Sequence, residues 1–310
     1  MRLALCLLLL AACDCDSSGT DADSAPTDAS LADVPRRDFG PAMPVDCVGE
    51  ALDEVFVLTT DLEDSSFESH LFRFDPETLE YLHVGEVVCP LDGAFLRSMA
   101  VDRNGNGYAT DNRGNLFRVD TDDASCAPTG METEQEGVRN FGMGYATVGD
   151  STDERLYITA TGTWYRDETT PYRRLLSIDT RALSVATIGD LEAPTPANME
   201  LTGTGDGRLF GMVLDVRDLR NIVVTVEHLD ADTGATLESK RVPLDASGGF
   251  AFAQWGGDFW LFTEAPDGRA RVAQFDWDGG EVLQTVDTEL DVPGTIIGAG
   301  VSTCAPFDLI

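Results

Sequence analysis

Residues 71–75 read LFRFD, a short run of alternating side chains that ends in an aspartate. Four more runs of this kind follow along the chain: LFRVD (116–120), LLSID (175–179), VEHLD (226–230) and VAQFD (272–276). They recur at intervals of about 45–60 residues, which is close to the length of one four-stranded blade of a β-propeller. The repeat therefore predicts five similar β-meanders.

Each of these runs is preceded by two other apolar runs. The nearer series is VFVLTT (55–60), GYAT (107–110), RLYITA (155–160), RLFGMV (208–213) and DFWLFT (258–263). The farther series is SMAVD (98–102), FGMGYAT (141–147), NMELTG (198–203), FAFAQW (250–255) and IIGAGVS (296–302). Aromatic and β-branched residues bounded by Gly, Asn and Asp are typical of strands and turns, and no segment has a helical period.

The two ends of the chain complete one blade. The first meander starts at Val55 without a strand of the farther series before it, whereas the run at 296–302 has no meander after it. Joining these ends closes the ring and leaves no free sheet edge. We therefore expect an all-β fold, a five-bladed β-propeller closed by its C-terminal strand, with a β-sandwich as the alternative. The glycines of FGMGYA (141–146) then fit close packing near the propeller axis.

The N-terminus has the pattern of a bacterial lipoprotein signal. The apolar run from Leu3 to Leu10 is too short to span a membrane, and it leads into Leu-Ala-Ala-Cys, which resembles a lipobox. This predicts a signal peptide over 1–12 and lipidation of Cys13. Residues 13–46 are rich in Asp, Ser, Thr, Ala and Pro, so we expect a disordered acidic tether before a propeller domain at 47–310.

The charge and the cysteine content of the chain limit which cellular locations and which partners are expected for it. With 55 acidic and 21 basic residues, the net charge of −34 argues against binding to nucleic acid, and any link to a membrane must come through the lipid. Cysteines are expected to pair in an oxidising compartment. Their positions favour the pairs Cys89–Cys126 and Cys47–Cys304, with Cys15 left over and other pairings still open. The expected location is extracytoplasmic, anchored by lipid at the periplasmic face or the cell surface.

A possible cation site begins at Asp102, where D-R-N-G-N-G matches the opening of a calcium loop through Asp102, Asn104 and Asn106. The twelfth position, which should hold a bidentate acid, is Arg113. We therefore interpret the segment as a hairpin turn between two strands, and expect no cofactor, with calcium as the alternative. TGDGRLF (204–210) and GGDFWLF (256–262) are interpreted as turns of the same kind.

Two features are candidates for ligand binding. The connection TGTWYRDETTPYRR (161–174) is long for a hairpin and brings aromatic residues beside arginines, a composition common at binding surfaces. Its candidate ligand-binding residues are Trp164, Tyr165, Arg166 and Tyr172, although the same rings could instead be buried against their own blade. Glu200 interrupts an otherwise apolar strand, and it could project into the central channel as a ligand-binding or channel-lining residue.

The motifs SMAVDRNG (98–105), WGGDFWLF (255–262) and GAGVSTCAP (298–306) together resemble a group of uncharacterised predicted bacterial lipoproteins with propeller-like β repeats. The resemblance supports the location and the fold, and it implies no activity. Since no nucleophile elbow, Walker loop or dinucleotide fingerprint occurs, we expect a binding or assembly module at the cell envelope, with a saccharide or an envelope protein as partner. The alternative is a hydrolase or lyase that acts on a sugar or lactone through channel carboxylates.

Overall fold

The computed structural model describes residues 47, 54–63, 65–149, 151–160, 174–191, 197–215, 222–244 and 248–307. Apart from one short 3-10 turn, η2 (Gln135–Gly137), the regular structure of these residues consists of strands in five antiparallel four-stranded sheets. The predicted all-β, five-bladed propeller is confirmed, and the alternative of a β-sandwich is wrong. Cys13 and the tether lie outside the described residues.

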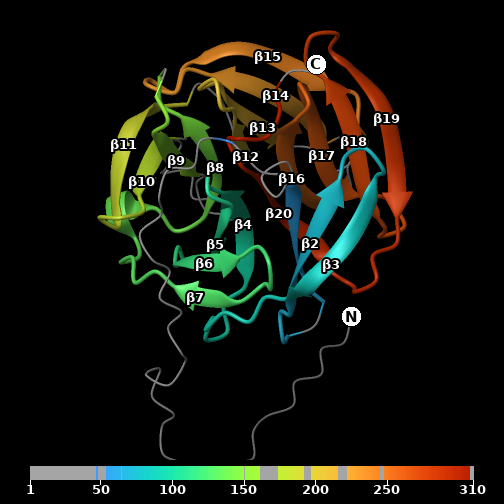
Figure 1. Ribbon diagram of the computed structural model, residues 1–310, viewed down its shortest axis with the longest axis horizontal. Coiled ribbons are helices and arrows are strands. Elements are labelled where there is room, and N and C mark those ends of the chain that lie inside the picture. The colour runs from blue at the N-terminus through green and yellow to red at the C-terminus, as the bar shows by residue number, and fades with distance from the viewer. Residues whose placement is uncertain are drawn as a thin grey trace, which may run out of the picture. The chain divides into compact units, whose positions relative to one another are not determined.

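Each sheet is one blade, and the strands of each blade are given from the innermost to the outermost. Blade 1 is β20 (Thr295–Val301), β1 (Val55–Thr60), β2 (Ser69–Asp75) and β3 (Glu80–Glu86); blade 2 is β4 (Leu96–Val101), β5 (Asn106–Asp111), β6 (Leu116–Asp120) and β7 (Cys126–Pro128); blade 3 is β8 (Phe141–Thr147), β9 (Glu154–Ala160), β10 (Arg174–Asp179) and β11 (Ser184–Asp190); blade 4 is β12 (Ala197–Gly203), β13 (Leu209–Asp215), β14 (Val223–Leu229) and β15 (Thr236–Val242); blade 5 is β16 (Gly248–Trp255), β17 (Asp258–Glu264), β18 (Ala270–Asp276) and β19 (Glu281–Thr288). Figure 1 shows the blades around a common centre, with β20, β4, β8, β12 and β16 nearest to it.

Blade 1 contains both ends of the propeller, as the sequence predicts. The C-terminal strand β20 pairs antiparallel with β1, so that Val55 faces Val301 and Phe56 faces Gly300. Every residue of β1 is buried, because β1 lies between β20 and β2 in its own sheet and packs against the neighbouring blades 2 and 5. The ring is therefore closed by backbone hydrogen bonds between segments that lie at opposite ends of the described chain.

The hydrophobic core is divided among the junctions between blades. The described residues form five apolar clusters, and each one joins side chains of two adjacent blades. One cluster packs Phe74 of blade 1 against Trp260 and Phe262 of blade 5, with ring centroids 5.5 and 5.1 Å apart. Because no blade buries both of its faces alone, stability depends on an unbroken ring.

Two glycines of the innermost strands allow this close approach. A Cβ atom added to Gly142 on β8 would lie 2.1 Å from the carbonyl oxygen of Met199 on β12. One added to Gly298 on β20 would lie 2.7 Å from the backbone nitrogen of Met99 on β4. Side chains do not fit between these backbones, which agrees with the expectation that the glycines of FGMGYA serve packing at the axis.

Both predicted disulfides are formed. Cys47–Cys304 links the residues just before β1 and just after β20, and Cys89–Cys126 links the segment after β3 to β7 in the next blade. The first bridge reinforces the closure of the ring, and the second joins the outer parts of blades 1 and 2.

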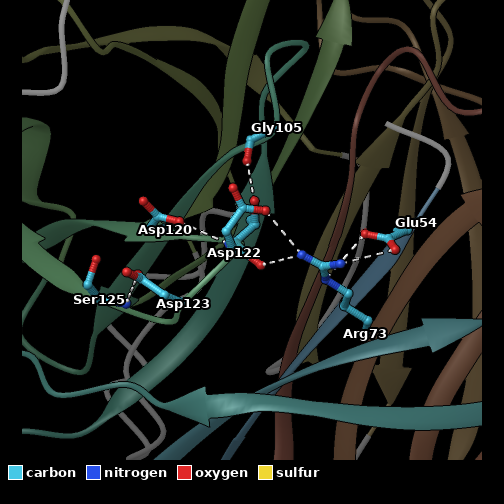
Figure 2. Close-up of polar contacts among 8 residues, drawn as sticks. Glu54, Arg73, Gly105, Asp120, Asp122, Asp123 and Ser125 are labelled. Atoms are coloured by element: carbon cyan, nitrogen blue, oxygen red, sulfur yellow. Dashed lines mark hydrogen bonds and ion pairs between the residues drawn. The ribbon is translucent and has the colours of Figure 1, made fainter. Parts of the chain in front are cut away.

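An arginine on β2 adds a polar contact between blades 1 and 2 (Figure 2). Arg73 pairs with Glu54 beside β1 at 3.3 Å and with Asp122 of the turn between β6 and β7 at 3.1 Å. It also donates to the carbonyl oxygen of Thr121, whose hydroxyl donates to the carbonyl oxygen of Gly105 at 2.7 Å. Asp122 is largely exposed, so its ion pair contributes little, and the partly buried contact with Glu54 and the backbone is the stronger part.

Candidate functional site

Glu200 lies on the innermost strand of its blade, close to the axis of the ring. It sits on β12 of blade 4, and it accepts a hydrogen bond from the hydroxyl of Ser98, which is on β4 of blade 2. The Ser98 hydroxyl in turn accepts a hydrogen bond from the backbone N–H of Met143 on β8, the innermost strand of blade 3, which lies between blades 2 and 4. Glu200 thus ties together the innermost strands of three consecutive blades.

The space beside Glu200 is small. A cavity of about 10 Å³ is bounded by Glu200, Arg97, Phe141 and Phe250 together with their neighbours. That volume holds one water molecule at most. A sugar ring does not fit into this cavity.

Burial controls the protonation of Glu200. With 7% of its surface exposed, desolvation raises the pKa of Glu200 to about 8, although the Ser98 hydrogen bond and the positive charge of Arg97 act in the opposite direction. The carboxyl group of Glu200 is therefore mostly protonated and uncharged at pH 7. In this form it can still hydrogen-bond to a water molecule.

Replacement of Glu200 by glutamine should reduce the dependence of stability on pH. The folded-state pKa lies above the unfolded value of 4.5, so ionisation of the unfolded chain lowers the free energy of unfolding as pH rises from about 4.5 to about 8. This amounts to about 1.4 kcal/mol per pH unit. Between pH 5 and pH 7, E200Q should gain about 2–3 kcal/mol relative to the wild type, measured by urea unfolding.

The exposed Glu80 on β3 provides the control, because E80Q removes a carboxylate without touching the axis. If the curves of stability against pH for E200Q and the wild type ran parallel, Glu200 would have to be ionised in the folded protein.

A second carboxylate, which is partly buried, lies near the other ends of the innermost strands. Glu154, at the start of β9, accepts the backbone N–H of Arg103 at 2.9 Å on both oxygens and the hydroxyl of Thr303 at 3.1 Å. Desolvation raises the pKa of Glu154 to about 7, and the nearby charge of Asp102 acts in the same direction. These contacts fasten the C-terminal segment to blades 2 and 3. Sequence reasoning missed Glu154 because nothing in DERLY separates it from the other acids of the chain.

Asp102 serves the hairpin between β4 and β5. It is 4% exposed, and its carboxylate accepts the backbone N–H groups of Asn104 and Asn106 at 2.9 and 2.8 Å and the side-chain amide of Asn106. The amide oxygen of Asn106 is itself bonded by Arg118. The side-chain oxygens of Asp102 and Asn106 are thus engaged by neighbouring donors, whereas the buried Oδ1 of Asn104 has no hydrogen-bond partner in the described part of the chain. In the part of the chain that the structure describes, no three His, Cys, Asp or Glu side chains are grouped so as to hold a metal ion.

A larger pocket lies between blades 4 and 5, with a volume of about 370 Å³. Blade 4 and its β12–β13 turn contribute Thr204, Arg208 and Phe210, whereas blade 5 contributes Asp258 at the start of β17 and the turn Asp276-Trp277-Asp278 after β18. We call this the interblade pocket. It lies at the C-terminal ends of the innermost strands β12 and β16, and Phe307 of the C-terminal segment lines it.

The C-terminal segment is held at the interblade pocket by backbone contacts. The carbonyl oxygen of Pro306 accepts the backbone N–H of Gly256 at 2.6 Å and the side-chain amide of Gln254 at 2.9 Å. Phe307 then lies under the guanidinium of Arg208, whose central carbon is 5.9 Å from the ring centroid. The disulfide at Cys304 and these bonds together set the position of one wall of the pocket.

The interblade pocket contains residues from turns that the sequence analysis had interpreted only as turns. TGDGRLF supplies Arg208 and Phe210, and GGDFWLF supplies Asp258. The other predicted binding residues, Trp164, Tyr165, Arg166 and Tyr172, lie outside the described residues. The strands beside that connection end at Ala160 and begin at Arg174, which pair with each other.

Comparison with known proteins supports the fold. No family model and no curated protein matches this sequence. Among solved structures, the chain is similar to 1,3Gal43A, an exo-β-1,3-galactanase from Clostridium thermocellum, with a TM-score of 0.53 and 9% identity over 79% of this chain and 62% of that one. At this identity the likeness concerns the fold alone.

Two further structures are more distant. TolB from Acinetobacter baumannii gives a TM-score of 0.45 and 12% identity over 79% of this chain and 55% of that one. Dihydro-heme d1 dehydrogenase NirN in complex with DHE gives a TM-score of 0.35 and 15% identity over 84% and 57%. This chain therefore spans less than two thirds of the length of any of these three chains.

Proposed function

We propose that this chain is a lipid-anchored, extracytoplasmic β-propeller that binds a ligand at the cell envelope through the interblade pocket. Two disulfides are typical of a protein that folds in an oxidising compartment. Within the described ranges, no helix is long and apolar enough to cross a membrane. The anchor is a lipid on Cys13, which is tested by acyl-chain incorporation that C13S abolishes and C15S retains.

The observation that carries the binding role is the size and lining of the interblade pocket. Its volume of about 370 Å³ lies in the range of small-molecule sites, about 300–1,000 Å³. Aromatic rings and charged side chains converge on it from two blades and from the C-terminal segment. The cavity at Glu200 is far too small for such a ligand, so the pocket supports binding better than the axis does.

Thermal unfolding with cell-wall fragments, oligosaccharides and simple amines tests the binding role. A ligand present at about 100 times its dissociation constant should add roughly 2.7 kcal/mol to the free energy of unfolding. D278W should abolish the shift, because Asp278 is an exposed residue at the pocket and a bulky side chain there narrows it.

Asp232 provides a matched control in the neighbouring blade. Its backbone N–H donates to Asp230 in the turn after β14, as that of Asp278 donates to Asp276 after β18. D232W should keep the full ligand shift. A shift that survives D278W would place the ligand elsewhere and contradict the proposed site.

A further inference from the structure

The interblade pocket has an excess of negative charge. Three carboxylates line it, those of Asp258, Asp276 and Asp278, and none of them has an ion-pair partner among the described residues. Arg208 also lines the pocket, but its Nε is bonded to both carboxylate oxygens of Asp206 at 3.1 and 2.9 Å. Lys240 is the other cation beside the pocket: its Nζ donates to the carbonyl oxygens of Trp277 and Asp278, and it pairs with Glu238 at 3.3 Å. Because each of these two cations already has its own acidic partner, the three carboxylates of the pocket leave an excess of negative charge.

Asp258 is the most enclosed of these acids. It is 5% exposed, and its Oδ2 accepts the side-chain amide of Gln274 at 2.6 Å, whereas its Oδ1 has no hydrogen bond within the described part of the chain. Desolvation raises the pKa of Asp258, and the charges of Asp276 and Asp278 add to this effect. A positive group entering the pocket would relieve this repulsion and could donate a hydrogen bond to Oδ1.

The aromatic rings of the pocket already attract cations of the protein itself. Lys240 Nζ lies 4.6 Å from the ring centroid of Trp277, and the guanidinium carbon of Arg208 lies 6.0 Å from that of Phe210. Ring faces attract cations through their quadrupoles, most strongly in Trp. Both rings are buried and already have a cation beside them, so the preference for a cationic ligand comes from the carboxylates.

From this arrangement we propose that the ligand of the interblade pocket carries a positively charged organic group, an ammonium or a guanidinium, which binds beside Asp258, Asp276 and Asp278. This inference rests on the proposed function, since it names the chemistry of the ligand at the same pocket. An anionic ligand would meet three carboxylates and two cations that already have acidic partners, Arg208 with Asp206 and Lys240 with Glu238. A neutral saccharide would leave the like charges uncompensated.

Calorimetric titration of the full chain in detergent, at 150 mM salt, tests the inference. The cationic probes are cadaverine and a lysine tripeptide blocked at both ends, which distinguish a free amine from a side chain of a protein partner. 1,5-Pentanediol is the neutral counterpart of cadaverine, and glucose represents saccharides. We expect one cation to bind per chain, with either cationic probe or both, and neither neutral probe to bind.

Variants distinguish binding of a cation at this site from nonspecific attraction of cations to a chain whose net charge is −34. D278K should weaken cation binding at least tenfold, because it places a positive charge at the pocket. D232K makes the same change of charge in the matched turn and should leave the affinity within about twofold of the wild type. D258N should also weaken binding, since it removes the enclosed carboxylate.

Two outcomes would overturn the inference. If the cationic probes failed to bind while glucose bound in a D278W-sensitive way, the ligand chemistry would be wrong and the proposed binding role would stand. If D278K and D232K weakened cation binding equally, the attraction would be a property of the whole acidic surface and not of the pocket. A fragment that shifts the unfolding midpoint in the wild type and in D232W, but not in D278W, would then still support the proposed function.

Discussion

Replacing Cys47 and Cys304 together by serine should lower the free energy of unfolding by about 5–6 kcal/mol. The bridge joins residues separated by 257 positions, so it removes a large loop-closure entropy from the unfolded chain. For a chain of this size the loss corresponds to a fall in the unfolding midpoint of about 10–20 °C. Calorimetry of the wild type and of the double variant, both under non-reducing conditions, measures the difference.

The second disulfide is the internal comparison. Cys89 and Cys126 are separated by 37 positions, so the same chain-entropy argument gives about 4 kcal/mol for C89S/C126S. The ring-closing bridge should therefore have the larger effect. If the shorter bridge contributed more, the stabilisation would come from local packing at blades 1 and 2, and not from the length of the closed loop.

The closure of the ring could be predicted because the sequence contains one inner strand without a meander and one meander without an inner strand. The run at 296–302 has no meander after it and Val55 has no inner strand before it, and a propeller resolves both by pairing them. The glycines of FGMGYA were informative for a similar reason, since only a close approach of backbones requires them. Glu200 stood out because an acid in an apolar strand must have a buried partner, which is Ser98.

The interblade pocket could not be predicted in this way. Its residues come from the turns after β12, β16 and β18 and from the C-terminal segment, and each turn taken alone has ordinary hairpin chemistry. Their convergence depends on how blades 4 and 5 are rotated against each other, and local sequence patterns do not encode that rotation. Glu154 was missed for the same reason, because its partners Arg103 and Thr303 are far from it in the sequence.

Truncation of Phe74 to alanine should destabilise the protein by about 3–5 kcal/mol, the usual cost of removing a buried aromatic ring. Phe74 is 1% exposed, and its ring contacts Tyr81 of its own blade and Trp260 and Phe262 of blade 5. The variant leaves a cavity at the junction where the ring closes. Urea unfolding followed by tryptophan fluorescence and by circular dichroism measures the loss.

Leu82 on β3 of the same blade is the control. Because its side chain is 65% exposed, L82A should change the free energy of unfolding by no more than about 0.5 kcal/mol. The two probes should also give the same midpoint for F74A, since each blade depends on the next for one face of its core. A separate early transition in F74A would instead mean that blade 1 can detach while the other four blades stay folded. In that case the ring would be held at this junction mainly by Cys47–Cys304 and the β1–β20 pairing, and adding C47S/C304S to F74A should lower the early midpoint alone.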